Sequence, residues 1–182
     1  VHIDASYLIE PKARSRAGGH FYMSSNSTHS KDNGAILNIA KIMKQVLTSA
    51  AEAEIGALFL NSRQAIPARR LLEEMGHKQP PTPIQTDNTT AFGFVNKIMV
   101  PKATKSTDMR YWYMRDQSDQ ENFRYYWGKG KGNRADYWTK HFSAAHHKEK
   151  RPIILTKPAE VALLRLSQGL RPHQYRTNPR MC

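Results

Sequence analysis

The sequence predicts an α/β domain in which three antiparallel strands precede a helical region that contains two further strands. Short apolar and polar alternations near the start indicate the strands, and apolar residues at helical spacing after residue 48 indicate the first long helix. The 182 residues, 39% of them hydrophobic and 9% aromatic, exclude wholesale disorder. A chain of this length can bury a core without disulfides or a structural metal.

The first three strands are predicted from short segments bounded by turn residues. Residues 1–7 form the first strand, and a basic loop that starts at Lys12 and ends in two glycines follows it. The alternating segment 20–25 is the second strand. Asp32-Asn33-Gly34 is a strong hairpin signal and leads into a third strand at 35–39.

The first long helix begins at a capping sequence. Thr48 or Ser49 can cap it, and Glu52 stands three residues after Ser49, which is the capping-box spacing. Pro67 predicts a break and a second helix at 67–75, which Gly76 ends.

The remaining elements alternate between strands and short helices. We predict strands at 82–86 and 123–127, helices at 89–95, 105–117 and 133–140, and a flexible basic loop at 128–132.

A boundary is expected near residues 140–150, so that residues 1–141 form the folded domain and residues 142–182 a basic, partly disordered tail. The segment 141–182 holds eight Lys and Arg and two Glu, a net charge of +6. Prolines recur beyond position 150, and 170–182 has almost no core-forming residues. A short helix is predicted at 158–170.

The net charge of +13, from 28 basic and 15 acidic residues, favours a polyanionic partner, with nucleic acid first. The lone cysteine, Cys182, excludes an internal disulfide framework and a cysteine-based zinc finger. No apolar run is long enough to span a membrane, and no signal peptide opens the chain. We therefore expect an intracellular protein, in the cytoplasm, a virus-like particle or the nucleus, and not a secreted one. Because the chain starts at Val1, we expect a fragment of a longer protein.

Four acidic residues stand where acids are unusual: Asp4 in the first strand, Glu54 in a small apolar helix segment, Asp87 at a strand end and Asp136 at the start of the last helix. Gathered together, they would repel one another unless a cation neutralised them, and oxygen ligands suit Mg²⁺ or Mn²⁺. Each acid alone also has an ordinary interpretation as a surface or capping residue. Glu52 competes with Glu54, and the apolar stripe does not decide between them.

Several motifs, taken in order, resemble the ribonuclease H domain of copia-type LTR retrotransposon polyproteins, which is part of their reverse transcriptase and ribonuclease H region. The similarity covers residues 1–141. The matching motifs are Asp4-Ala5-Ser6-Tyr7, the Ser49-to-Ala57 segment SAAEAEIGA, Gln85-Thr86-Asp87-Asn88, the basic helix start at 104–111, and Asn133-Arg134-Ala135-Asp136-Tyr137-Trp138-Thr139-Lys140. The resemblance implies a ribonuclease H-like fold, a five-stranded mixed sheet flanked by helices, with a first strand shortened relative to the family.

The resemblance also implies a catalytic, metal-binding set of Asp4, Glu54, Asp87 and Asp136, and it selects Glu54 over Glu52. Two Mg²⁺ or Mn²⁺ ions would then support hydrolysis of the RNA strand of an RNA–DNA hybrid during reverse transcription. A reverse transcriptase domain of the same polyprotein is the implied partner. Basic residues are expected to contact the hybrid backbone: Lys102, Lys105, Arg110, Arg115, Lys129, Lys131 and Arg134.

Three other interpretations remain open. The chain could be a catalytically inactive retroelement remnant that only binds nucleic acid. It could be an integrase or transposase of the same fold, although those enzymes tend to end their acid triad with a late Glu, whereas the last acid here is Asp136. It could also be a basic interaction module whose acids are only helix caps.

Overall fold

The computed structural model describes residues 1–24, 34–98 and 105–155, without the side chains of 105–108. The described residues fall into two compact units. The first comprises residues 1–23 and 35–143, and it carries every element considered below except α5 (Ala144–Ile154), which belongs to the second. The predicted hairpin turn at 32–33 and the predicted helix at 158–170 lie outside the described residues.

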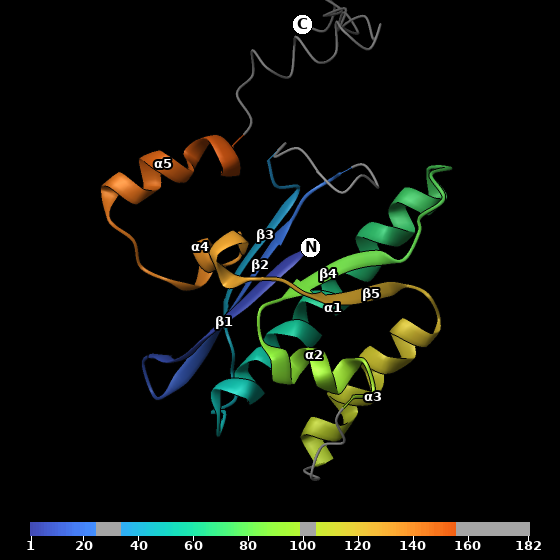
Figure 1. Ribbon diagram of the computed structural model, residues 1–182, viewed down its shortest axis with the longest axis horizontal. Helices are drawn as coiled ribbons and strands as arrows, with labels where there is room; N and C mark the ends of the chain where they lie inside the picture. The colour runs from blue at the N-terminus through green and yellow to red at the C-terminus, as the bar shows by residue number, and fades with distance from the viewer. Residues whose placement is uncertain (25–33, 99–104, 156–182) are drawn as a thin grey trace, which may run out of the picture. The chain divides into compact units, whose positions relative to one another are not determined.

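The first unit is built on a five-stranded mixed sheet flanked by helices, which confirms the predicted α/β class (Figure 1). In space the strands run in the order β3-β2-β1-β4-β5, so the first strand is central. β1 pairs antiparallel with β2 and parallel with β4; β2–β3 is antiparallel and β4–β5 parallel. The strands are β1 (His2–Glu10), β2 (Arg14–Phe21), β3 (Leu37–Ile42), β4 (Thr82–Thr86) and β5 (Phe123–Trp127).

The second strand corrects the sequence prediction. β2 starts at Arg14 and includes Gly18 and Gly19. The predicted basic loop is therefore only a short turn, in which Lys12 and Ala13 have positive φ. Gly18 and Gly19 do not form a turn; they allow other parts of the chain to pack closely against β2. A Cβ on Gly18 would lie 2.5 Å from the Cγ2 atom of Thr139, and a Cβ on Gly19 would overlap the Asn61 amide. Neighbouring strand residues point to opposite faces, so the helices that carry Thr139 and Asn61 lie on opposite sides of the sheet.

The first helix, α1 (Ala50–Glu74), is one continuous element, so the predicted break at Pro67 is wrong. Ser49 caps its start: the Ser49 hydroxyl accepts a hydrogen bond from the Glu52 amide at 3.1 Å. The Glu52 carboxylate in turn accepts a hydrogen bond from the Thr48 amide at 2.8 Å. The helix ends in a Schellman motif at Gly76, whose φ is +88°.

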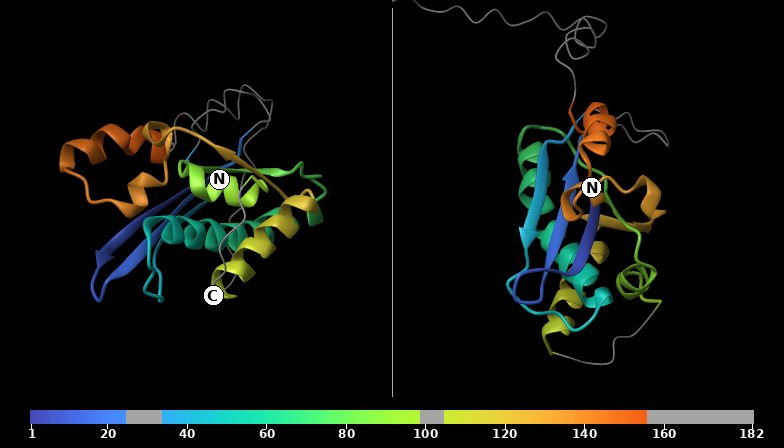
Figure 2. Two further views of the ribbon diagram at one scale, coloured as in Figure 1. Left: turned by 60° about the horizontal axis from the view of Figure 1, so that its bottom comes forward. Right: turned by 90° about the vertical axis from the view of Figure 1, so that its left-hand side faces the viewer.

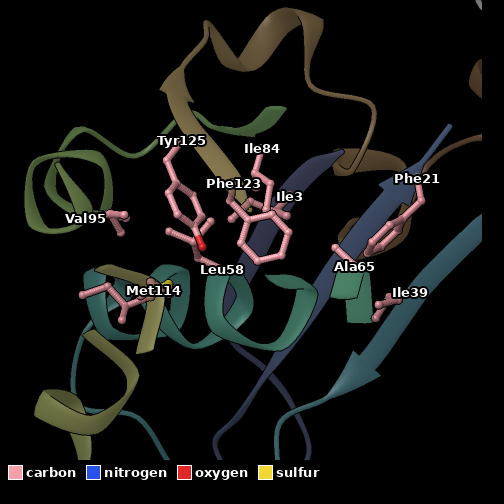
Figure 3. Packing of buried hydrophobic residues seen from close by; sticks show 12 residues of the cluster. Ile3, Phe21, Ile39, Leu58, Ala65, Ile84, Val95, Met114, Phe123 and Tyr125 are labelled. Atoms are coloured by element: carbon pink, nitrogen blue, oxygen red, sulfur yellow. The ribbon is translucent and has the colours of Figure 1, made fainter. Parts of the chain in front are cut away.

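Two more helices, α2 (Thr89–Val95) and α3 (Lys105–Asp119), complete the core on the α1 face of the sheet (Figure 2). The predicted helix at 89–95 and strands at 82–86 and 123–127 are confirmed with the same bounds. Figure 3 shows the core, in which buried side chains from the sheet meet α1, α2 and α3. Its members include Ile3, Phe21, Leu58, Ile84, Val95, Met114, Phe123 and Tyr125.

The other face of the sheet carries α4 (Asp136–Thr139), a single turn that follows a 3₁₀ turn at Gly130–Gly132. In the second unit, α5 occupies a polar stretch for which no helix is predicted from the sequence. Its Ala and Lys residues favour a helix. The sequence does not indicate this helix clearly, because it contains Pro152 and lacks an apolar stripe. No helix in the described part of the chain is long and apolar enough to cross a membrane.

Candidate metal centre

The four predicted acids come from four separate elements and lie near the carboxyl end of β4. Asp4 lies in the middle of the sheet on β1, Glu54 in the first turns of α1, Asp87 directly after β4, and Asp136 at the first position of α4. One carboxylate oxygen from each of Asp4, Asp87 and Asp136 lies within 4.8 Å of the others. The structure thus brings together side chains that are up to 132 positions apart.

Glu54 lies beside this trio and is almost fully buried, with 9% of its surface exposed. Its Oε1 atom accepts a hydrogen bond at 3.3 Å from the amide of Ala5, the residue that follows Asp4. Its Oε2 atom is buried and has no donor among the described residues. Glu52, by contrast, is used in capping α1. The geometry therefore places Glu54, and not Glu52, at the acidic cluster.

The capping interpretation of Asp87 fails on local geometry. The side chain of Asn88 takes the N-cap of α2 and accepts a hydrogen bond from the Ala91 amide at 2.9 Å. The Asp87 carboxylate faces the glycine-rich loop at residues 128–132 instead, where a Cβ on Gly130 would lie 2.7 Å from Oδ2. This loop can approach Asp87 so closely because glycine has no side chain.

Asp136 is not a helix cap either, because it lies inside α4 after the N-cap residue Ala135. Its Oδ2 atom pairs with the Lys140 ammonium at 2.8 Å, one helical turn further along. Its Oδ1 atom is buried without a donor among the described residues.

Burial and mutual repulsion raise the pKa values of three carboxyl groups in the cluster, those of Glu54, Asp4 and Asp87. Burial raises the pKa of Glu54 to about 9, with further contributions from the charges of Asp4 and Asp87. Burial also raises the pKa of Asp4 to about 7, partly opposed by a hydrogen bond that the Thr139 hydroxyl donates to Asp4. The pKa of Asp87 is raised by burial and then by the charge of Asp136. Ionising these clustered carboxyl groups is costly without a nearby positive charge, so the site favours a bound cation.

Thr139 and Lys140 are two residues of the site that were not predicted from the sequence. Both belong to the motif that carries Asp136, at positions i+3 and i+4, and this spacing puts them on the same side of a helical turn. The spacing therefore indicates that Thr139 and Lys140 lie near Asp136. It does not indicate that they lie near Asp4, because that depends on the packing of α4 against β1.

A polar clip holds the start of α4 against β1. Asn133 is buried and donates a hydrogen bond from Nδ2 to the Ile3 carbonyl at 2.6 Å. Its Oδ1 atom accepts one from the Ala135 amide at 3.0 Å. The Arg134 amide donates to His2 Nδ1 at 3.2 Å. These bonds fix Asp136 relative to Asp4, because each clip residue lies within three positions of one of the two acids.

The predicted nucleic-acid contacts occupy different environments. Lys129 and Lys131 are exposed on the loop beside Asp87, and the Arg134 guanidinium lies 4.3 Å from the centre of the Tyr22 ring. Arg110 is buried and donates to Gln45, so its position is that of a packing residue. Arg115 stacks on Tyr111 at 4.0 Å and donates to the Phe94 carbonyl. Lys102 lies outside the described residues, as does the side chain of Lys105.

Comparison with known proteins relates the chain to retrotransposon polyproteins. Over 107 residues, 59% of this chain, it is 31% identical to a protein of Nicotiana tabacum described as "Retrovirus-related Pol polyprotein from transposon TNT 1-94". The matched region spans 8% of the length of that polyprotein. No protein-family model matches the chain.

Proposed function

We propose that this chain is a divalent-metal-dependent endonuclease of the ribonuclease H-like fold, which hydrolyses the RNA strand of RNA–DNA hybrids during retrotransposon reverse transcription. The convergence of Asp4, Glu54, Asp87 and Asp136 from four elements carries the proposal. The strand order, with a central β1 between antiparallel and parallel neighbours, and the similarity to a retrotransposon Pol polyprotein support it.

The donor set fits Mg²⁺ or Mn²⁺, which prefer carboxylate oxygens. An acidic cluster alone would be weak support, but the buried Oε2 atom of Glu54 and Oδ1 atom of Asp136 have no donors among the described residues. Buried carboxyl oxygens without hydrogen-bond partners are costly, and a bound cation would satisfy both. Asp4, Glu54, Asp87 and Asp136 would hold two ions, which when bound supply Lewis-acid activation of water and stabilise the leaving oxygen.

The chain's own residues position the substrate and tune the site. Thr139 fixes the Asp4 carboxylate, and the clip at Asn133 holds Asp136 opposite it. Glu54 would contact the 2′-hydroxyl beside the scissile phosphate, since this group distinguishes RNA from DNA. Lys129 and Lys131, exposed beside Asp87, would contact the phosphate backbone without reading its sequence.

A cleavage assay on the purified chain tests this function. A hybrid with labelled RNA is incubated with Mg²⁺, with Mn²⁺ or with chelator, alongside double-stranded DNA of the same sequence. We expect cleavage of the RNA strand only in the hybrid and only with a divalent ion. Hybrid binding without cleavage under all conditions would overturn the enzymatic proposal and favour a nucleic-acid-binding remnant.

The same proposal includes a partner. In a polyprotein, a reverse transcriptase domain of the same chain would supply further grip on the hybrid, so adding such a domain in cis should lower the KM for the hybrid more than it changes kcat. A lowered kcat with an unchanged KM would contradict this part.

A further inference from the structure

Lys140 is a cation placed at the edge of the acidic cluster. Its ammonium lies 2.8 Å from Asp136 Oδ2, and the two side chains are 48% and 27% exposed. Burial of Lys140 lowers its pKa, but its bond to Asp136 and the charges of Asp4 and Asp87 more than offset this, so that the pKa is raised. Lys140 in turn opposes the raised pKa values of Asp4 and Asp87, which come from burial and from the charge of Asp136. The geometry therefore places its positive charge against Asp136, which shares a cluster of carboxylate oxygens with Asp4 and Asp87.

A lysine in this place has two opposite effects. Without a divalent ion, its charge offsets part of the repulsion among the carboxylates and so stabilises the folded state. With a divalent ion bound to the same carboxylates, two cations share one small site and repel each other. The Lys140 ammonium cannot diffuse away when a divalent ion binds, because Lys140 is part of the same chain, one helical turn after Asp136.

We propose that Lys140 is an internal counter-cation, which neutralises the acidic cluster when it is metal-free and lowers its affinity for divalent ions. The inference rests on the proposed metal site and concerns how tightly that site binds its ions. Lys140 is a positioning residue that acts through Asp136. It would keep the affinity low enough for ions to exchange.

The test compares Lys140→Gln with the unchanged protein in two measurements at one slightly alkaline pH. Thermal unfolding in chelator should show a melting temperature lower by a few degrees in the variant. Calorimetric titration with Mn²⁺ alone should show binding tighter by about tenfold, the order expected for removing one charge near a divalent ion at a partly exposed site. A merely structural role for Lys140 would weaken both stability and Mn²⁺ binding.

Three further variants complete the test. Lys97→Gln removes an exposed ion pair of the same length, 2.8 Å to Asp119, at the ends of α2 and α3, and should leave Mn²⁺ affinity unchanged. Lys140→Arg keeps the charge and should bind Mn²⁺ like the unchanged protein. Lys140→Met is a second neutral variant and should behave like Lys140→Gln.

Two results are kept distinct. If the unchanged protein does not bind Mn²⁺, the proposed metal site itself is wrong. If it binds Mn²⁺ and the neutral variants bind equally or more weakly, or if both fail to fold, the counter-cation inference is overturned and the metal site stands.

Discussion

At Asp87 the proposed chemistry depends on a single charge. The side chain is half-buried, is not used as a cap, and lies within 4.8 Å of carboxylate oxygens of Asp4 and Asp136. An amide of the same shape would keep the packing against the glycine-rich loop but would lose one negative ligand.

We therefore predict that Asp87→Asn abolishes divalent-dependent hybrid cleavage while it retains most hybrid binding. Gel-based cleavage and fluorescence anisotropy measure the two properties in parallel. The control is Asp116→Asn, which changes an exposed acid on α3 and should leave both unchanged. Full cleavage by the Asp87 variant would remove this residue from the site.

Glu54 makes a prediction about pH. Its pKa is raised to about 9, so the folded state holds its proton more tightly than the unfolded state does. The stability that this proton contributes is present at acidic pH and is lost as pH rises through the folded-state value.

In chelator, the melting temperature of Glu54→Gln should therefore rise relative to that of the unchanged protein as pH goes from 5 to 9. Burial lowers the pKa values of His2 and His20 to about 3 and about 4, but both proteins share these groups and their effects cancel in the difference. A difference that stays constant across this range would contradict the raised pKa of Glu54.

At the scale of elements, the contact between α4 and β2 leaves no room for a side chain at Gly18. A Cβ there would lie 2.9 Å from the carbonyl oxygen of Ala135, as well as against Thr139. Thr139 also holds Asp4, so a displaced α4 would disturb the acidic cluster directly.

Gly18→Ala should destabilise the protein by about 1–3 kcal/mol, the usual cost of overpacking, and should also weaken Mn²⁺ binding. Denaturant unfolding and calorimetry measure these effects. Gly132→Ala is the matched control: a Cβ there meets nothing within 4 Å, so the change in stability should stay within about 0.5 kcal/mol. Equal behaviour of the two variants would show that the α4–β2 contact is looser than in this structure.

At the scale of the whole molecule, the fold gathers acids in a chain whose net charge is +13. The excess of basic residues favours a polyanion, while the cluster near the carboxyl end of β4 favours a cation. A nucleic-acid backbone held near divalent ions satisfies both preferences.

Divalent ions should therefore raise the melting temperature, because the proposed site would bind them in the folded protein and not in the unfolded chain. At a free ion concentration one hundred times Kd, the gain is about 2.7 kcal/mol. Scanning calorimetry with Mn²⁺, and with NaCl at matched ionic strength, tests this. Asp4→Asn should lose the Mn²⁺ effect, and an equal rise with NaCl alone would contradict a specific site.

Local sequence patterns predicted the class of the fold and most of its elements. Alternation and turn residues located β4 and β5, and the Ser49 cap located the start of α1, because these signals act over a few neighbouring residues. The sequence also pointed to the four acids, which the resemblance assigned to one site.

Features that depend on long-range packing became visible in the folded arrangement alone. Gly18 and Gly19 were predicted to close a turn, but they lie inside a strand because Thr139 and Asn61 approach it from opposite faces. Pro67 was predicted to end a helix, yet α1 runs through it because the packing of the helix against the sheet outweighs one lost hydrogen bond. The clip at Asn133 and the charge of Lys140 beside Asp136 likewise depend on where α4 packs against the sheet, and local sequence signals do not carry that information.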